Sequence, residues 1–205
     1  MTRGKFITIE GGEGVGKSTN IAYVKSLLEE KGIDCIVTRE PGGTPLAEEI
    51  REVLLKHREE RVVSETELLL MFAARAQHLY QLILPAINEG KWVVSDRFTD
   101  ATYAYQSGGR GVPADQVALL EKFVQKDFKP SITLLLDAPV EIGMTRARER
   151  GKLDRFEEER SAFFNKVRKN YLERAKAEPD RFKIIDATQS LELVQSNIRQ
   201  VLALD

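Results

Sequence analysis

The stretch from Gly11 to Ser18 has the residue types and the spacing of a phosphate-binding loop. It reads Gly-Gly-Glu-Gly-Val-Gly-Lys-Ser and matches the pattern G-x-x-x-x-G-K-[ST]. Glycines let a backbone fold tightly and point its N–H groups at phosphate oxygens. In such a loop the lysine, here Lys17, reaches the β- and γ-phosphates, and the serine hydroxyl can hold a magnesium ion. The motif therefore predicts binding of a nucleoside triphosphate.

The segments around this loop have the patterns of a strand and a helix, which a chance match in a glycine-rich turn would lack. Residues 6–9 are apolar and β-branched, as in a short buried strand. Residues 19–31 carry apolar side chains at helical spacing and are closed by Gly32. A helix that begins at the phosphate adds free N–H groups and the positive end of its dipole.

A second loop, from Arg39 to Pro45, contains two prolines and two glycines and follows a predicted strand at 33–38. This composition favours a stiff, shaped loop over a linker. Open α/β sheets bind their ligands at the carboxyl ends of strands, so the loop is a candidate for ligand binding. A simple turn is the alternative.

Asp96 and Arg97 directly follow another predicted strand, residues 91–95. A carboxylate in this place, downstream of a phosphate loop, is where a magnesium-linked aspartate is expected. An adjacent arginine can clamp a phosphate with two hydrogen bonds. The alternative is an ion pair at the protein surface.

Arg75 is a lone cation in the otherwise apolar turn 71–78. It lies either at the surface or in the interior for a specific reason, and the pattern does not decide between the two. His78 has no second histidine or cysteine at ligand spacing, so the turn does not indicate a metal site.

Hydrogen-bonding and aromatic residues gather again at Thr102, Tyr105 and Gln106, before a glycine-rich segment at 108–111 that we expect to be a flexible turn. Such groups suit the binding of a small polar ring and a sugar.

A basic segment begins inside a helix predicted to start at about Val140. Its members are Arg146, Arg148, Arg150, Lys152 and Arg155. A run of charge is usually a solvated helix face. Because Gly151 breaks the helix and a phosphate loop lies elsewhere in the chain, we favour a mobile flap at about 146–157 that brings arginines to phosphates.

The remaining segments complete an alternation of strands and helices. Ser64 and Glu67 predict a capping box at the start of a helix that runs to about residue 89, with Pro85 bending it. Residues 132–137 are apolar enough for a strand buried on both faces of a parallel sheet. We expect a further strand at 182–185 and further helices at 46–57, 113–126, 157–178 and 190–204. The alternation predicts an α/β fold, a three-layer sandwich of a parallel sheet with helices on both faces.

Length and composition narrow the class of protein. The chain has 205 residues, which is most simply one domain with ample length for a core. Lys and Arg number 31 against 32 Asp and Glu, so no net field attracts nucleic acid or a membrane surface. Cys35 is the only cysteine, which excludes a disulfide within the chain and a zinc site of several cysteines. With no long apolar run and no signal-peptide core, we expect a cytoplasmic protein.

Other classes of phosphate-loop protein lack their signatures here. The motif N-K-x-D, with which GTPases read guanine, does not occur, because Asn165-Lys166 continues as Val-Arg; D-x-x-G is absent too. The transport ATPase signature L-S-G-G-Q is also absent, and helicases and ring ATPases need a longer chain. A small kinase of nucleotides or metabolites remains.

Five motifs resemble those of thymidylate kinases and occur in the same order. They are residues 6–19, Thr38-Arg39-Glu40-Pro41-Gly42-Gly43, Asp96-Arg97-Phe98, Tyr105-Gln106 with Gly108 to Gly111, and residues 146–156. The resemblance extends from about residue 5 to residue 202. It implies transfer of the γ-phosphoryl group of ATP to thymidine 5′-monophosphate, with Mg²⁺, by a homodimer packed through helices.

The resemblance also implies roles for individual residues. ATP would be bound by Gly11, Gly12, Glu13, Gly14, Val15, Gly16, Lys17, Ser18, Thr19 and Arg146. Thymidine monophosphate would be bound by Glu40, Pro41, Met71, Phe72, Arg75, Arg97, Thr102, Tyr105 and Gln106. The catalytic residues would be Lys17, Arg97, Arg148, Arg155 and Glu13, and the ligands of Mg²⁺ would be Ser18 and Asp96.

Two positions depart from the common pattern of the family. Glu13 stands where some members, notably eukaryotic ones, have an arginine, so the catalytic arginines would come from the flap, as in many bacterial enzymes. Met71 stands where phenylalanine is frequent, with Phe72 next to it, and either side chain could stack on the base.

Two other functions stay open on the sequence. Another nucleoside-monophosphate or deoxynucleoside kinase would keep the loop and Arg97 but prefer a different acceptor. A regulatory module that binds ATP would have little use for an arginine-rich flap.

Overall fold

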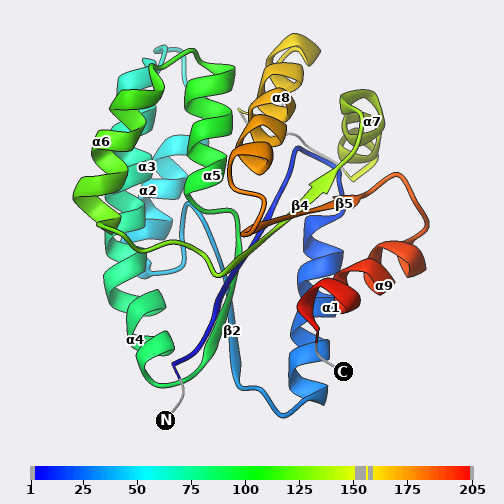
Figure 1. Cartoon of the computed structure of the whole chain (residues 1–205). Helices are drawn as coiled ribbons and strands as arrows, with labels where there is room; N and C mark the ends of the chain where they lie inside the picture. Colours follow the sequence, from blue (N-terminus) through cyan, green and yellow to red (C-terminus); the bar gives the residue numbers. More distant parts are fainter. Residues whose placement is uncertain (1–2, 151–155, 157–158, 204–205) are drawn as a thin grey trace.

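In the part of the chain that the structure describes, five parallel strands form one sheet between two layers of helices (Figure 1). This computed structural model covers residues 3–150, 156 and 159–203. The strands lie in the order β2-β3-β1-β4-β5. Their bounds are β1 Phe6–Glu10, β2 Cys35–Arg39, β3 Trp92–Asp96, β4 Ile132–Asp137 and β5 Phe182–Asp186. Each lies close to its expected range, and the predicted three-layer α/β sandwich is confirmed.

The helices alternate with these strands. Their bounds are α1 Lys17–Glu30, α2 Pro45–Leu55, α3 Ser64–His78, α4 Leu84–Asn88, α5 Thr99–Thr102, α6 Ala114–Gln125, α7 Val140–Arg150, α8 Ser161–Ala177 and α9 Leu191–Leu202, with π-helical turns at η1 Leu79–Ile83 and η2 Tyr103–Gly109. The helix predicted at 157–178 is α8, which begins only at Ser161, because the backbone of Arg160 is extended.

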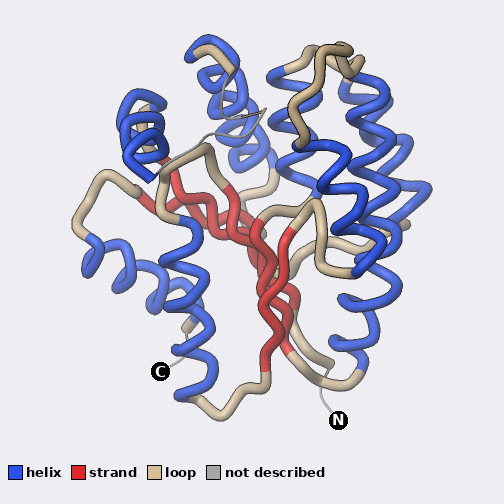
Figure 2. The backbone as a smooth tube through the Cα atoms, turned by 180° about the vertical axis from the view of Figure 1, so that it is seen from behind, coloured by secondary structure: helices blue, strands red, loops and turns tan. Residues whose placement is uncertain are grey.

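Apolar side chains point to both faces of the sheet, and each face is covered by helices. Ile9 and Leu134 belong to a buried cluster with α1 and α9 on one face. Phe6 and Val93 pack with η1 and α4 on the other face, where Leu135 packs with α7 and α8. Seen from behind, the helices flank the sheet on both sides, and the two termini lie toward the same end of the molecule (Figure 2).

The helix predicted from 64 to 89 is built from α3, η1 and α4 in succession. The widened turn η1 comes just before Pro85, whose ring and missing N–H do not fit a regular α-helix. The predicted capping box is wrong. Val63, and not Ser64, precedes the first turn, and the carboxylate of Glu67 accepts hydrogen bonds from Arg110 at 3.0 and 3.3 Å.

The prediction of a flexible turn at 108–111 is also wrong for the first half of that segment. Gly108 and Gly109 belong to the π-helical turn η2, which packs closely on α8. A Cβ on Gly108 would lie 2.8 Å from the Cβ of Asn170, and one on Gly109 would collide with the ring of Phe163. The two glycines therefore serve close packing of two helices, which a reading of glycine as a turn residue does not anticipate.

The topology brings the loops of the predicted site to one edge of the sheet. The chain first adds β2 and β3 on one side of β1, and then crosses to add β4 and β5 on the other side. Such a reversal opens a crevice at the carboxyl ends of the strands. The loops after β1, β2 and β3 all leave the sheet at this edge. Within the described ranges, every helix is too short or too polar to serve as a membrane span.

Candidate active site

The loop after β1 is shaped by glycines in the left-handed region of φ. Gly16, at φ 89°, directly precedes α1, and no side chain caps the first turn of that helix. Gly14, at φ 66°, lies against Gly143 of α7 so closely that a Cβ on Gly14 would collide with the backbone oxygen of Gly143. The loop therefore packs tightly on α7 and leaves the first N–H groups of α1 open to an anion.

Lys17 is nearly buried and folds back over its own loop. Its Nζ donates to the carbonyl oxygens of Gly12 at 2.8 Å and Gly11 at 3.3 Å. Burial and the nearby charge of Arg97 lower the pKa of Lys17, against the opposing effect of Glu13. An additional anion bound over the loop would therefore lie beside the desolvated ammonium group of Lys17.

We call the cavity over the loop the loop cavity. It is lined by Glu13, Gly14, Val15, Gly16, Lys17, Ser18, Thr19, Arg51, Asp96, Arg97 and Arg146. The residues predicted to bind a triphosphate and Mg²⁺ therefore line one cavity, apart from Gly11 and Gly12, which contact Lys17. Arg146 also donates to the carbonyl oxygen of Ala187 at 3.1 Å.

Asp96 has a carboxylate oxygen, Oδ1, that is buried and has no hydrogen-bond partner among the described residues. A buried anionic oxygen without a partner is unfavourable unless a cation or a donor joins it. Ser18 lines the same cavity. No cluster of three or more His, Cys, Asp or Glu side chains suited to a metal occurs in residues 3–150, 156 and 159–203. The carboxylate of Asp96 and the hydroxyl of Ser18 therefore fit Mg²⁺, which uses few protein ligands together with phosphate and water.

The turn after β3 places Arg97 in a strained conformation. Its φ is 69°, a left-handed value that is uncommon for residues with a side chain. The hydroxyl of Ser95 donates to the carbonyl oxygen of Arg97 at 2.7 Å, and the N–H of Phe98 donates to Glu10 at 2.7 Å. Burial, together with the negative charge of Asp100, raises the pKa of Glu10 to about 8. These contacts hold the strained turn in place.

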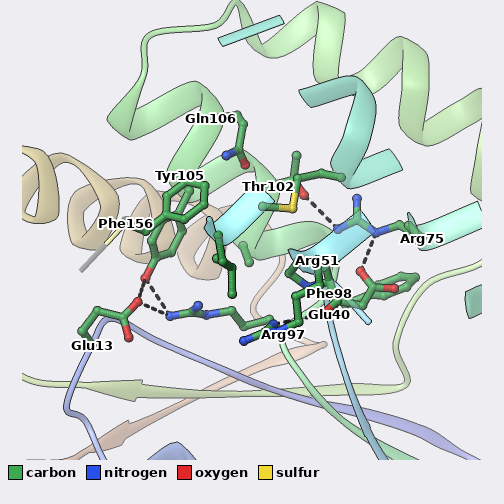
Figure 3. Close-up of a pocket in the computed structure, with 14 residues that line it drawn as sticks. Glu13, Glu40, Arg51, Arg75, Arg97, Phe98, Thr102, Tyr105, Gln106 and Phe156 are labelled. Carbon is green, nitrogen blue, oxygen red and sulfur yellow. Dashed lines mark hydrogen bonds and ion pairs between the residues drawn. The ribbon is translucent and has the colours of Figure 1, made fainter. Parts of the chain in front are cut away.

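Arg97, Glu13 and Tyr105 form a compact hydrogen-bonded group (Figure 3). Arg97 Nη2 donates to Glu13 Oε1 at 2.5 Å and to the Tyr105 hydroxyl oxygen at 2.8 Å, and that hydroxyl donates to Glu13 Oε1 at 2.7 Å. Burial alone would raise the pKa of Glu13, but the charges of Arg97 and Lys17 and these hydrogen bonds lower it to about 2. Glu13 is therefore an anion that fixes the Arg97 guanidinium.

A second cavity, which we call the side pocket, lies next to the loop cavity. It is lined by Glu13, Glu40, Pro41, Arg51, Leu55, Met71, Arg75, Arg97, Phe98, Ala101, Thr102, Tyr105, Gln106 and Phe156. The predicted residues Glu40, Pro41, Arg75, Thr102 and Gln106 are thus brought together from three separate segments. Apolar walls with a few convergent polar groups are typical of a small-molecule site.

Arg75 is buried, which decides between the two interpretations that the sequence left open. Its Nε donates to Glu40 Oε2 at 2.7 Å and its Nη2 donates to Thr102 Oγ1 at 2.8 Å. Its Nη1 has no partner among the described residues, and the same is true of both amide atoms of Gln106. Three buried polar atoms on residues that line the pocket thus lack partners, which suits a ligand with a polar edge.

Met71 and Phe72 lie in different surroundings. Met71 lines the side pocket, whereas Phe72 is 2% exposed, belongs to the core around Leu68, and lies under the guanidinium of Arg75 at 4.7 Å. The structure therefore places Met71 where a ring in the pocket could be contacted, and Phe72 where it supports Arg75.

Sequence reasoning missed five residues that line the side pocket, namely Arg51, Leu55, Phe98, Ala101 and Phe156. Arg51 on α2 lines both cavities and donates to the carbonyl oxygen of Pro41 at 2.9 Å. Phe98 and Phe156 form apolar walls of the side pocket. Phe98 could have been suggested by its place in the Asp-Arg-Phe motif, but Arg51 stands in an ordinary charged helix with no local signal.

The predicted flap is only partly described. Arg146 and Arg148 lie on α7 with exposed side chains, and Arg146 lines the loop cavity, whereas Arg148 lines neither the loop cavity nor the side pocket. Arg155 lies outside the described residues.

Glu13, Arg51 and Arg97 line both cavities, so two cations and one anion stand at their junction. A phosphate on one side and a triphosphate on the other could share these cations. The arrangement is suited to bringing two anionic groups together in a partly desolvated place, as phosphoryl transfer requires.

Comparisons with known proteins agree with this chemistry. A family model described as thymidylate kinase matches residues 9–198. A thymidylate kinase of Pseudomonas putida is 57% identical over 199 residues, which cover 97% of this chain and 95% of that protein. One of Hahella chejuensis is 58% identical over 203 residues, covering 99% and 98%. The crystal structure of thymidylate kinase from Ehrlichia chaffeensis superimposes with a TM-score of 0.79 at 31% identity, covering 98% and 99%.

Proposed function

The chain belongs to the thymidylate kinase family, and from that premise we propose that the two cavities hold the two nucleotides of the family's reaction. The activity is transfer of the γ-phosphoryl group of ATP to thymidine 5′-monophosphate. The loop cavity takes the triphosphate of ATP, and the side pocket takes the acceptor. The observation that carries this assignment is that Glu13, Arg51 and Arg97 line both cavities, so the donor and acceptor phosphates meet there.

On the donor side, Lys17 and the open N–H groups at the start of α1 bind the β- and γ-phosphates. Ser18 and Asp96 would hold Mg²⁺, in keeping with the unpartnered Oδ1 of Asp96. When bound, the ion neutralises charge on the phosphate oxygens. Arg146, which lines the same cavity, contacts ATP at its outer end.

On the acceptor side, Arg97 and Arg51 bind the monophosphate. Arg97 is already oriented by Glu13 and Tyr105, so little side-chain entropy is lost when the phosphate arrives. Glu13 therefore acts as a positioning residue for Arg97, while its backbone belongs to the loop.

The unpartnered atoms of Arg75 and Gln106 read the edge of the base. Arginine can only donate, so Arg75 Nη1 suits the 4-keto oxygen of thymine and not the 4-amino group of cytosine. The amide of Gln106 offers an acceptor for N3–H and, by rotation, a donor. Met71 contacts the face of the base, and Tyr105 lies beside the deoxyribose.

The mechanism depends on positioning and charge, because the acceptor is already an anionic phosphate and needs no strong base. Holding two like-charged groups in line for transfer is the main task. Lys17, Arg97 and Arg51 supply fixed positive charge, and we propose that Arg148 and Arg155 add charge in the transition state. A flap over the site would also exclude water, which otherwise accepts the phosphoryl group.

The test is an assay of the purified chain with ATP, Mg²⁺ and a panel of acceptors. We expect thymidine monophosphate to give ADP and thymidine diphosphate in equal amounts, with higher kcat/KM than other monophosphates or thymidine itself. A higher kcat/KM for another acceptor would favour the alternative kinase, and the absence of ADP would favour a regulatory module.

We further propose one domain, a cytoplasmic location and a homodimer that packs through α3 and α6. These neighbouring helices expose Leu69, Leu119 and Phe123, which are 58%, 72% and 81% exposed. Large apolar side chains exposed together are typical of an interface. Sedimentation of Phe123→Asp should show a shift to the monomer, whereas Leu193→Asp on α9 should sediment as the wild type does.

A further inference from the structure

A chain of buried hydrogen bonds runs from β2 through the loop after it to α3 and α5. Its members are Thr38, His78, Glu40, Arg75 and Thr102, and each is at most 9% exposed. Thr38 Oγ1 lies 2.7 Å from His78 Nε2, and His78 Nδ1 lies 3.0 Å from Glu40 Oε1. Glu40 Oε2 accepts from Arg75 Nε, and Arg75 Nη2 donates to Thr102 (Figure 3). Four side chains thus fix the plane of one guanidinium.

The donors and acceptors of this chain determine where the protons lie. The carboxylate of Glu40 only accepts, so His78 Nδ1 must carry a proton. In the tautomer that carries its proton on Nδ1, His78 Nε2 accepts a hydrogen bond from the Thr38 hydroxyl. Both oxygens of Glu40 are held, one by His78 and the other by Arg75.

The glycine-rich loop after β2 is built around this histidine. Gly43 lies at φ 89°, and a Cβ there would collide with the ring of His78 and with the Thr38 hydroxyl. The loop that contributes Glu40 to the side pocket can therefore close over His78 only with glycine at position 43. This contact gives a physical reason for one of the two glycines in the stiff loop.

We propose that His78 is a positioning residue for base selection, acting through Glu40 on Arg75. The inference rests on the proposed function, in which Arg75 Nη1 meets the 4-keto oxygen of the base. His78 lies behind Glu40, does not line the side pocket, and so acts on the base only through the other two residues. Without it, Glu40 loses one of its two fixed oxygens, and the guanidinium is held less firmly against the base edge, by Thr102 and by a carboxylate that can itself rotate.

Discrimination between thymine and cytosine should depend on the orientation of the Arg75 guanidinium more than on any other part of the pocket. Gln106 can rotate its amide to face either a protonated or an unprotonated N3, so it discriminates little between thymine and cytosine. Arg75 cannot accept a hydrogen bond in any orientation, so it rejects a 4-amino group only while its Nη1 is held against the base. The preference for the 5-methyl group is separate, because it depends on apolar contacts such as Met71.

The experiment compares kcat/KM for thymidine monophosphate, 5-methyl-2′-deoxycytidine monophosphate and 2′-deoxyuridine monophosphate. The variants are His78→Leu and Thr38→Val, with Thr38→Ser and His57→Leu as matched controls, since His57 is the other histidine and is exposed. We expect the keto-to-amino ratio to fall about tenfold in His78→Leu and about threefold in Thr38→Val, as for loss of one or part of one hydrogen bond.

In the same variants, the ratio of thymidine to deoxyuridine monophosphate and the KM for ATP should stay at wild-type values. Thr38→Ser keeps the hydroxyl and should behave as the wild type, as should His57→Leu. If kcat/KM falls by the same factor for all three acceptors, His78 only supports the fold and the proposal is overturned. An unchanged keto-to-amino ratio in a variant with wild-type kcat/KM would overturn it as well. If His78→Leu does not fold, Thr38→Val against Thr38→Ser decides by the same ratios. A wild-type enzyme without keto-to-amino preference would instead overturn the assignment of Arg75 itself.

A second measurement does not depend on activity. In the ¹⁵N-labelled chain, which has two histidines, long-range ¹H–¹⁵N spectra distinguish the two imidazole tautomers. We expect the His78 ring to be protonated on Nδ1. The His78 signal is identified by its loss in His78→Leu. If that variant does not fold, it is identified by its persistence in His57→Leu. A ring protonated on Nε2 alone would break the chain at Glu40 and overturn the proposal.

Discussion

The loop cavity and the side pocket share the same two arginines, Arg51 and Arg97, yet the chain builds the two cavities in opposite ways. The loop cavity takes seven lining residues from one continuous stretch, Glu13 to Thr19. The side pocket is lined from six separate segments between residues 13 and 156. The first is made largely of backbone groups and a helix end, which any glycine-rich loop of this spacing provides. The second depends on side chains whose positions are set by one another.

From this contrast we expect the two cavities to respond differently to substitutions. Loss of one side chain from the loop cavity removes charge, while the backbone donors stay in place. Loss of one side chain from the side pocket disturbs its neighbours, because Arg97 with Glu13 and Arg75 with Glu40 are linked pairs. Substitutions on the donor side should therefore change turnover, and those on the acceptor side should change selectivity or stability as well.

The largest effect should follow from Lys17→Ala. The side chain supplies the cation nearest to the loop's phosphate position and packs on its own loop, so the fold should remain intact. Loss of one such group from a preorganised site lowers kcat by about 10²–10³-fold. Circular dichroism and the melting temperature provide the control for folding. A folded variant within about tenfold of the wild-type kcat, a change of only about 1.4 kcal/mol, would contradict the assigned role.

This contrast also explains how much could be predicted from the sequence. The loop, its flanking strand and helix, and the parallel sheet follow from patterns within a few residues, and the structure agrees with them. Arg51 could not be predicted, because its place at the junction depends on how α2 packs against α3. The π-helical turn η2 and the packing role of Gly108 were missed for the same reason, since glycine in a sequence is as consistent with a turn as with close helix contact.

The next effect in size should come from Arg97→Ala. Arg97 stands in both cavities, so we expect losses in acceptor affinity and in kcat that together reach about 100-fold in kcat/KM, as for truncation of a buried charge partner. Arg97→Lys keeps a charge but not the fork that contacts Glu13 and Tyr105, and it should recover only part of the loss. Wild-type affinity and turnover in the folded Arg97→Ala variant would reduce Arg97 to a structural ion-pair partner.

A smaller effect concerns the stability contributed by Glu13. Its pKa of about 2 in the folded state lies below the ordinary value of 4.5, so the folded state favours the anion. The resulting stability is fully present above about pH 4.5 and is lost as the pH falls toward 2. We expect Glu13→Gln to lower the free energy of unfolding at pH 7 by about 2 kcal/mol, as for a hydrogen bond to a charged group.

Urea unfolding of both proteins at pH 7 and pH 3 provides the measurement. The difference between wild type and Glu13→Gln should shrink to about half by pH 3. Glu29→Gln, at an exposed carboxylate on α1, is the matched control and should give no difference at either pH. A difference independent of pH would mean that Glu13 contributes shape and not charge.

The smallest effect should separate two roles of Tyr105, which belongs to the side pocket but is tied to the loop through Glu13. Its ring is 5% exposed and packs edge-on against Phe156, Phe163 and Tyr171, so its position is fixed. In the proposed binding mode the ring lies beside C2′ of the acceptor sugar and leaves no room for a hydroxyl, so ribonucleotides are rejected by a clash. The hydroxyl of Tyr105 has a different task, since it contacts Arg97 and Glu13.

Tyr105→Ala should therefore raise the kcat/KM ratio of ribothymidine to thymidine monophosphate by about tenfold, because the clash is removed while the base contacts remain. Tyr105→Phe keeps the ring and should leave that ratio at the wild-type value, while weakening acceptor binding modestly through the loss of the hydroxyl. The ratio of thymine to uracil substrates should stay unchanged in both variants, because no base contact is altered. An equal change of the sugar ratio in the two variants would assign sugar selection to the hydroxyl, and an unchanged ratio in a folded Tyr105→Ala would remove Tyr105 from the sugar site.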